Sequence, residues 1–357
     1  MASFAEAVVE EILEDRLDLV RLRVSASAGP VEAVGFPAML GPLKAGDRVV
    51  INTTGIDLGL GTGGVAFVLW NLAGSGPRER GPGHIVKLRY TPWQMNVMAV
   101  EAPESPHHEA LAEVTELDGI PVVACGLHSQ VAGVAAGIKA AAPQARVGYL
   151  MTDAGALPLA WSRLVTELCG AGLVDSTCTS GHAFGGELES VNVFSGLAAL
   201  KRAAAVDVAV ASPGPGIVGT ATALGFSGIE QGQLLDAACA LGGKSYACLR
   251  ISFADDRARH RGVSHHSLTA LRIAARERST VVLPRLGAGR MEVLRRQLKA
   301  LEGRHELIEE EGEAGLELLA AKGIEPSTMG RRLGDSAEPF LAASAAGRAA
   351  ARVLEAR

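Results

Sequence analysis

The sequence contains few aromatic side chains, no closely paired cysteines and no long apolar helical run. Aromatic residues make up 4% of the 357 residues, and the five cysteines form no C-x-x-C pair. This spacing argues against a disulfide framework and against a structural zinc site. The longest uncharged segment lies between Asp207 and Glu230 and contains two prolines and several glycines, so it does not predict a bilayer-spanning helix.

An excess of positive charge is also absent. Lysine plus arginine number 34 and aspartate plus glutamate number 39, which gives a formal net charge of -5. This balance argues against a general affinity for nucleic acid or for an anionic membrane surface. The first 16 residues carry acidic side chains where a secretory signal would have a basic flank and an apolar run, so we expect a cytoplasmic protein.

The chain does contain enough apolar material for two hydrophobic cores. Hydrophobic residues make up 48% of the sequence, and its length exceeds that of one typical domain. Near residues 102–106, where two prolines lie close together, the sequence changes from short strand-like segments to alternating strand-like and helix-like segments. We therefore predict a β-rich domain over residues 1–100 and an α/β domain over residues 101–357.

Short segments rich in branched residues alternate with turn signals in the first domain. They predict five or six strands and no helix. The segments are residues 8–13, 17–24, 31–40, 48–53, 65–72 and 84–90, with a glycine run at residues 59–64 and a loop of Gly, Pro and Arg at residues 74–83. This pattern is typical of a small barrel or sandwich.

Strand-like and helix-like segments alternate in the second domain. The alternation predicts a mostly parallel sheet with flanking helices, which is a Rossmann-like α/β fold. The predicted strands are residues 120–125, 146–151, 174–177, 206–211, 246–251, 280–283 and 306–309. The predicted helices are residues 129–142, 157–169, 191–205, 230–241, 267–278, 291–301 and 342–357.

Polar and glycine residues follow five of these strands. Open parallel sheets bind ligands beyond the carboxyl ends of their strands, so we predict a small-molecule site there. The candidates, in strand order, are His128; Asp153; Cys178, Ser180 and His182; Gly214, Gly216, Gly219 and Thr220; and Asp255, Arg257, Arg259, His260 and His265. The alternative is that such loops are polar in any protein and that their Ser and Asp side chains cap helices.

Four of the candidates are assigned to catalysis. His182 or His260 would act as a general acid or base, and Asp153 completes the set. Cys178 would be a nucleophile with His182 as its base, and Ser180 is a competing nucleophile. The alternative for Cys178 is a buried small residue.

The stretch from residue 212 to residue 220 contains a G-x-G-x-x-G pattern after a predicted strand. Its backbone N–H groups would approach a phosphate or carboxylate at a helix N-terminus. Pro215 removes one donor, and the next strand ends near Asp255, too late for the acidic residue of a dinucleotide fingerprint. The pattern therefore favours an anion-binding loop over a nicotinamide site, with a tight turn as the alternative.

The stretch from residue 255 to residue 266 mixes carboxylates, guanidinium groups and imidazoles. Its arginines would hold a phosphate or carboxylate, and its His and Asp residues could bind a divalent metal or transfer protons. The spacing matches no known metal motif. Because His265 and His266 are adjacent, we expect their side chains to diverge, with at most one of them in a common site. The alternative is an exposed charged loop.

Four stretches in combination resemble a known type of family. They are AGDRVVINTT at residues 45–54, LGLGTGG at 58–64, GHIVKLRYT at 83–91 and RHRGVSHH at 259–266. The combination resembles an uncharacterised bacterial protein family, a domain of unknown function that would span nearly the whole chain. The resemblance implies one architecture and a bacterial origin, and it brings no activity and no catalytic residues.

The leading hypothesis is an enzyme that acts on a small anionic or phosphorylated metabolite in the α/β crevice. Neither a cofactor nor a metal is identified by the sequence. A second hypothesis is a non-catalytic ligand sensor that uses the same loops. A third is a structural or assembly protein whose Ala-rich C-terminal helix forms contacts between copies, since a Gly- and Ala-rich chain suggests a homo-oligomer.

Overall fold

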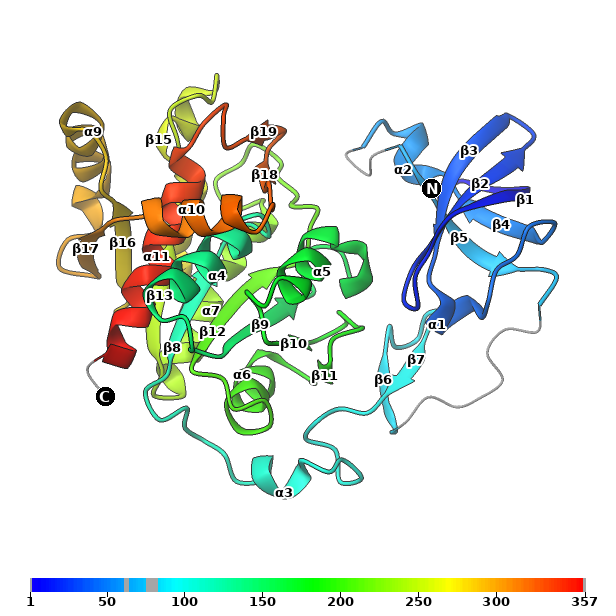
Figure 1. The fold of residues 1–357 in the computed structure, drawn as a ribbon, viewed down its shortest axis with the longest axis horizontal. Coiled ribbons are helices and arrows are strands. Elements are labelled where there is room, and N and C mark those ends of the chain that lie inside the picture. The colour runs from blue at the N-terminus through cyan, green and yellow to red at the C-terminus, as the bar shows by residue number, and fades with distance from the viewer. Residues whose placement is uncertain (1, 61–63, 75–82, 356–357) are drawn as a thin grey trace. The chain divides into compact units, whose positions relative to one another are not determined.

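A computed structural model describes residues 2–60, 64–74 and 83–355 (Figure 1). The chain divides into two compact units, Met1–Val97 and Met98–Arg357. The centre of the predicted glycine run and most of the predicted loop at residues 74–83 lie outside the described residues. Among the described residues, no helix combines the length and the hydropathy that a membrane span requires.

The first unit is a closed five-stranded barrel, in the order β1-β2-β3-β5-β4. Alternate residues of β2 (Val20, Leu22 and Val24) point into its core, as the two-residue period of a strand requires. The strands are β1 (Phe4–Asp15), β2 (Val20–Ala26), β3 (Gly29–Gly35), β4 (Arg48–Asn52) and β5 (Ala66–Asn71), followed by the hairpin β6 (Ile85–Lys87) and β7 (Met95–Val97). The barrel confirms one of the two predicted β architectures.

The prediction that this unit has no helix is wrong. The segment predicted as a strand over residues 31–40 leaves the sheet after Gly35, and α1 (Pro37–Leu40) follows it. Pro37 lies at the first position of α1, where its fixed φ suits a helix and its missing N–H is not needed. A second short helix, α2 (Thr54–Asp57), follows β4.

The second unit contains an eight-stranded sheet in the order β11-β10-β9-β12-β8-β13-β16-β17, and every pairing in it is parallel. This confirms the predicted α/β fold. The strands are β8 (Pro121–Cys125), β9 (Val147–Thr152), β10 (Ser176–Thr179), β11 (Leu188–Glu189), β12 (Val208–Pro213), β13 (Lys244–Cys248), β16 (Thr280–Pro284) and β17 (Glu306–Glu310). In the described part of this unit, four small strands outside the sheet form two antiparallel pairs. They are β14 (Ile251–Ser252) with β15 (Gly262–Val263), and β18 (Ser327–Thr328) with β19 (Arg331–Arg332).

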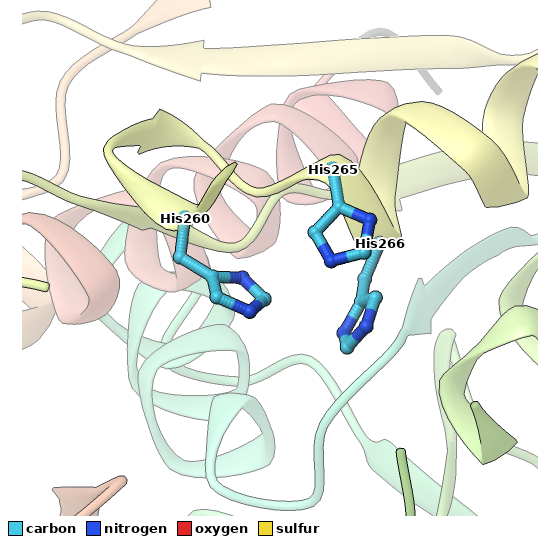
Figure 2. A group of neighbouring side chains, drawn as sticks. All are labelled: His260, His265 and His266. Atoms are coloured by element: carbon cyan, nitrogen blue, oxygen red, sulfur yellow. The ribbon is translucent and has the colours of Figure 1, made fainter. Parts of the chain in front are cut away.

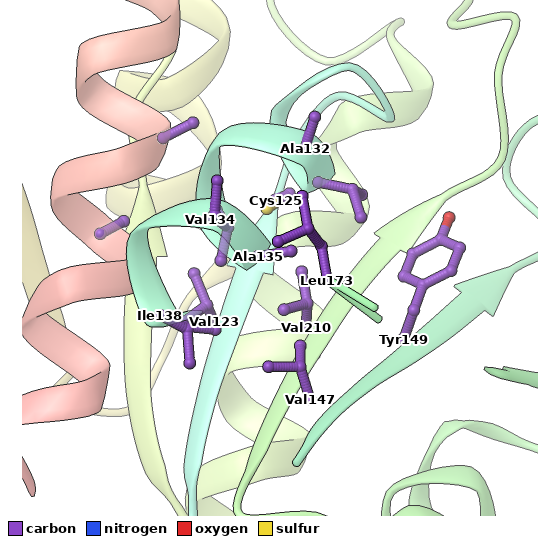
Figure 3. Close-up of a cluster of buried hydrophobic side chains, with 14 of the residues drawn as sticks. Val123, Cys125, Ala132, Val134, Ala135, Ile138, Val147, Tyr149, Leu173 and Val210 are labelled. Carbon is purple, nitrogen blue, oxygen red and sulfur yellow. The ribbon is translucent and has the colours of Figure 1, made fainter. Parts of the chain in front are cut away.

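Helices cover both faces of the sheet, so its central strands are apolar on both sides. In β8, Val123 and Cys125 face one core, and Val122 and Ala124 face the other. The first core also contains residues of α4 (Gln130–Ala141), α5 (Arg163–Gly170), α10 (Glu313–Ala321) and α11 (Glu338–Glu355), and Figure 3 shows part of it. The second core contains residues of α6 (Val193–Arg202), α7 (Glu230–Ala240) and α9 (Ala288–Leu298). Two further helices are α3 (His108–Leu111) and α8 (His265–Thr269).

The alanines of the C-terminal helix are buried within the second unit. Ala342, Ala346 and Ala350 belong to its cores, and α11 packs directly against α4. The two helices approach so closely that a Cβ atom on Gly137 would overlap the backbone oxygen of Ser344. The alanine-rich face therefore serves the fold of one chain, which removes the reason for assigning it to contacts between copies.

Several predicted helices begin or end at other residues. The predicted helix at residues 157–169 is divided by Ser162 into a 3-10 turn, Leu159–Trp161, and α5. The predicted helix at residues 267–278 begins earlier, as α8, and continues as a π-helix, Ala270–Ala274. The helix α10 was not predicted.

We expect Gly137→Ala to destabilise the protein, because a methyl group there must push α4 and α11 apart. Overpacking of this kind costs about 1–3 kcal/mol. The matched control is Gly289→Ala in α9, where an added Cβ meets no atom of the described residues within 4 Å. Urea unfolding should show a lower midpoint for the Gly137 variant only. Equal midpoints would contradict the helix contact.

Candidate functional site

The site is built where the chain leaves two neighbouring central strands in opposite directions. From β8 the chain passes to α4 on one face of the sheet, and from β12 it passes to α7 on the other face. The carboxyl ends of two such strands leave a crevice between their loops, which is where open α/β sheets bind ligands. The loop after β8 begins at Gly126, and the loop after β12 begins at Gly214.

A pocket of about 440 Å³ lies at this crevice. The loop after β8 contributes His128 and Ser129, and the start of α5 contributes Ser162 and Arg163. The remaining wall consists of Leu127, Trp161, Leu164, Glu167, residues 214–217 and residues 325–329. The volume falls in the range of small-molecule sites.

His128 forms hydrogen bonds with both of its ring nitrogens. Its Nδ1 lies 3.0 Å from the hydroxyl oxygen of Tyr149, and its Nε2 lies 2.6 Å from Oγ of Ser162. The Tyr149 hydroxyl continues to Oγ of Ser212 at 3.2 Å, and Ser212 donates to the carbonyl of Pro213 at 2.9 Å. Figure 3 shows the ring of Tyr149 at the edge of the aliphatic core.

One direction of this chain of hydrogen bonds gives every hydroxyl an acceptor for its proton. In this direction Nδ1 of His128 is protonated and donates to Tyr149, Tyr149 donates to Ser212, and Ser212 donates to the Pro213 carbonyl. The Ser162 oxygen accepts from the backbone N–H of Val165 and donates its own proton to Nε2 of His128. In this tautomer, the lone pair on Nε2 faces the Ser162 hydroxyl.

Burial sets the charge of this group of side chains. Removal from water lowers the pKa of His128 to about 4, so the imidazole is neutral at pH 7. Removal from water also raises the pKa of Tyr149 above its ordinary value, so its hydroxyl keeps its proton. A neutral imidazole that accepts a hydrogen bond from a serine hydroxyl has the state that a general base needs.

The glycine loop contributes to the pocket wall. Gly214 and Gly216 line it, but a Cβ on Gly214 would overlap the carbonyl of Ala156, so this glycine permits contact between two loops. Gly216 has a φ of +93°, which L side chains rarely adopt. The loop does not open directly into a helix as expected, because a turn and the 3-10 helix Ser227–Ile229 precede α7.

Gly219 and Thr220, the other two candidates in the loop after β12, lie in a tight turn. Gly219 forms an isolated antiparallel bridge with Phe226. The N–H and the hydroxyl of Thr220 both donate to the carbonyl of Gly225. The Thr220 hydroxyl thus stabilises the turn in this structure.

Four candidates lie around the ends of β9 and β10. Asp153 accepts a hydrogen bond of 2.9 Å from the backbone N–H of His182, whose ring is partly exposed. Ser180 is 2% exposed, and its N–H donates to the carbonyl of Met151. Cys178 lies within β10, fully buried. The structure brings Asp153 and His182 together through the backbone, and it places the Cys178 thiol inside the core.

Asp255 organises the charged loop after β13. Its carboxylate lies 2.9 Å from Arg257 and 3.4 Å from Arg250, and it is 4% exposed. The hydrogen bond with Arg257 holds the pKa of Asp255 well below its usual range. Arg259 is exposed and adds positive potential beside His265, although burial is the larger cause of the lowered pKa of that histidine.

Three histidines gather at the same loop (Figure 2). The rings of His260, His265 and His266 lie 4.2–5.0 Å apart between centroids. Burial lowers the pKa of His260 to about 4 and that of His266 to about 3. The prediction that His265 and His266 diverge is wrong, because successive residues of a helix are rotated by about 100° rather than by the half-turn of a strand.

Sequence reasoning missed three side chains that the structure brings to these places. Tyr149 lies in a predicted strand and Ser162 lay within a predicted helix, so neither was expected at a loop. His266 was discounted in favour of its neighbour. A signal for Ser162 existed, because a serine that precedes an amphipathic helix favours the capping position, and Ser162 occupies that position in α5.

The fold and the pocket define the class of protein: an α/β protein with a small-molecule-sized pocket at the carboxyl ends of its central parallel strands, joined to a small β-barrel. The chain belongs to the family described as protein of unknown function (DUF3866), whose match covers residues 32–347. Comparison with curated proteins and with solved structures gives no match. The resemblance seen in the sequence is thereby confirmed for the family.

We expect His128 to make the protein less stable in mild acid. The unfolded chain binds a proton at a pKa of about 6.5, whereas folded His128 has a pKa of about 4. As the pH falls from about 6.5 to about 4, protonation therefore favours the unfolded state. The free energy of unfolding, measured with urea at several pH values, should fall more steeply for the wild type than for His128→Gln. Parallel curves would contradict the burial of this imidazole.

Proposed function

We propose that this protein is an enzyme that transfers or hydrolyses an acyl group of a small anionic metabolite in the pocket beside His128. The observation that carries the proposal is the distance of 2.6 Å between Oγ of Ser162 and Nε2 of His128, in a histidine whose Nδ1 is held by Tyr149. A nucleophile, a base and a group that orients the base form the common arrangement of nucleophilic catalysis.

Both nitrogens of His128 are bonded to protein groups, so before Ser162 reacts the imidazole can act on a substrate only through the Ser162 hydroxyl. In the proposed reaction, Oγ of Ser162 attacks the carbonyl carbon of an ester or thioester while Nε2 of His128 takes its proton. The leaving group departs with that proton, and an acyl-serine remains. A water molecule, deprotonated by the same nitrogen, then releases the acid and restores the serine.

The start of α5 supplies groups that suit the developing oxyanion. Ser162 is the N-cap residue, and its side chain and carbonyl accept from the N–H groups of Val165 and Thr166. The N–H groups of Arg163 and Leu164 are the remaining ones of this first helical turn, and both residues line the pocket. Backbone N–H groups beside a nucleophile stabilise a tetrahedral intermediate.

Cationic side chains at two places support an anionic substrate, although the carboxylates of Glu167 and Glu325 also line the pocket. Arg163 lines the pocket, where it also pairs with Glu167 at 2.9 Å. Arg331 lines a small cavity that shares Leu127, Ser129, Thr328 and Met329 with the pocket. A carboxylate or phosphate group of the substrate would bind at this side.

The sensor hypothesis uses the same pocket for binding without proton transfer. Covalent labelling of Ser162 distinguishes an enzyme from such a sensor. A bacterial source, a cytoplasmic location and a homo-oligomer remain predictions. If Ser162 and His128 prove inert, the earlier predictions stand as alternatives. These are an acid or base role for His182 or His260 and a nucleophile role for Cys178.

We expect a small fluorophosphonate to label Ser162 covalently, because His128 increases the nucleophilicity of its hydroxyl. Intact mass spectrometry gives the extent of labelling, and peptide mapping gives its position. Removal of the general base in His128→Gln should slow labelling by roughly 10²–10⁴-fold. Tyr149→Phe should cause a smaller decrease, because the imidazole loses its orienting partner and keeps its lone pair.

The control for loss of the cap is Ser162→Asn, which retains a capping side chain and lacks the hydroxyl, since Ser162→Ala alone would cost about 1 kcal/mol of helix stability. Ser195→Ala in α6 should label like the wild type. If the folded wild type is not labelled at Ser162 and yet binds carboxylates or phosphates in a thermal-shift panel, the enzyme proposal fails and the sensor hypothesis gains support.

A further inference from the structure

The histidine group follows β13, on a different segment from the Ser162 pair, and the hydrogen bonds of its ring nitrogens are incomplete among the described residues. In the described part of the chain, Nε2 of His265 and Nδ1 of His266 are buried atoms with no hydrogen-bond partner. Nδ1 of His260 lies 2.8 Å from Oγ of Ser264. An unpaired polar atom away from water destabilises a fold, so two of them in one place need an explanation.

We propose that His260, His265 and His266 bind one divalent transition-metal ion and leave a coordination position open. One nitrogen of each ring belongs to a set of atoms that all lie within 4.8 Å of one another (Figure 2). Imidazole nitrogens suit zinc, copper, iron and nickel ions, and three histidines with an open position are a known arrangement of catalytic zinc.

The surroundings of the three rings fix their orientation. The His266 ring stacks on Phe226 with 4.0 Å between ring centroids and 8° between the ring planes. The bond between His260 and Ser264 leaves Nε2 of His260 free to be a ligand, and a hydrogen bond on the other nitrogen is what metal-binding histidines usually have. Ser264 is also the N-cap of α8, so it positions His265 and His266 at the start of that helix.

The three rings must move closer together to bind one ion. Zinc–nitrogen bonds of about 2.0–2.1 Å place three nitrogens around one trigonal or tetrahedral ion about 3.3–3.6 Å apart. Nitrogens within 4.8 Å of one another must therefore approach by up to about 1.5 Å, through rotation of the imidazole rings and small shifts of the loop. His265 and His266 are partly exposed, which leaves room for such a movement.

Arginines determine what can complete the coordination. Arg250, Arg257 and Arg259 all add positive potential at His260 or His265, and Asp255 supplies one carboxylate against them. A divalent ion adds more positive charge to this loop. The open position therefore suits an anionic ligand, namely hydroxide or an oxyanion such as phosphate, rather than a neutral one.

The test uses the full chain, free of any affinity tag and treated with chelator, titrated with Co²⁺ and then with Zn²⁺. We expect one equivalent of Co²⁺ to bind, with visible absorption bands typical of a low-coordinate site, and Zn²⁺ to displace it. His265→Asn should lose stoichiometric binding. Ser264→Ala should weaken binding by roughly 10–100-fold, because it removes the hydrogen bond that orients His260.

Two further variants make the result specific. His107→Asn, in a different part of the unit, should bind Co²⁺ like the wild type. Arg259→Gln should retain Co²⁺ but show a smaller spectral change when inorganic phosphate is added. Circular dichroism and thermal unfolding verify that each variant is folded. The proposal is overturned if the wild type binds no stoichiometric Co²⁺, or if folded His265→Asn binds it equally well. Neither result bears on the labelling of Ser162.

Discussion

The burial of the central parallel strands on both faces is the constraint on which the rest of this unit depends. Residues of β8, β9 and β12 are buried along their whole length, and their backbone groups pair within the sheet. Such strands have no room for unpaired polar side chains. Polar chemistry is therefore concentrated at the carboxyl ends, and the opposite exits from β8 and β12 produce the crevice.

The two polar groups of side chains differ in how completely their hydrogen bonds are satisfied. The series from Ser162 through His128 and Tyr149 to Ser212 ends on a backbone carbonyl, so each hydroxyl has a partner. A complete series of this kind is rigid, and its members polarise one another. The histidine group after β13 is incomplete, because two of its buried nitrogens have no hydrogen-bond partner among the residues that the structure describes. The complete hydrogen bonding of the first group fits the proposed reaction, and the incomplete hydrogen bonding of the second fits the proposed binding of an ion.

The fold could be predicted from the sequence because the hydrophobic periodicity of strands and helices and the residues that end them are local features. Alternating strand and helix patterns predict a parallel sheet, and that architecture is confirmed. Boundaries were less accurate where one residue decides them: Pro37 starts a helix within a predicted strand, and Ser162 divides a predicted helix. The strand order, in which β12 lies between β8 and β9, arises from long-range packing and has no local signal.

The sequence predicts the location of the candidate site better than it predicts which residues form it. Strand ends directed attention to His128, Gly214 and His260, which lie at such ends. Tyr149 and Ser162 are not predicted as site residues, because a tyrosine in a strand and a serine in a helix have ordinary structural explanations. Their significance appears only when two loops bring them to opposite nitrogens of one imidazole.

One loop physically connects the two proposed sites. Ile217, in the loop after β12, lines the pocket, and Gly219, two residues later, lies beside the ring of His266. The same stretch is fixed by Val218, whose N–H donates to Ser227, and by Phe226, on which His266 stacks. The wall of the proposed acyl-transfer pocket and the surroundings of the proposed metal site therefore share one packed segment of the chain.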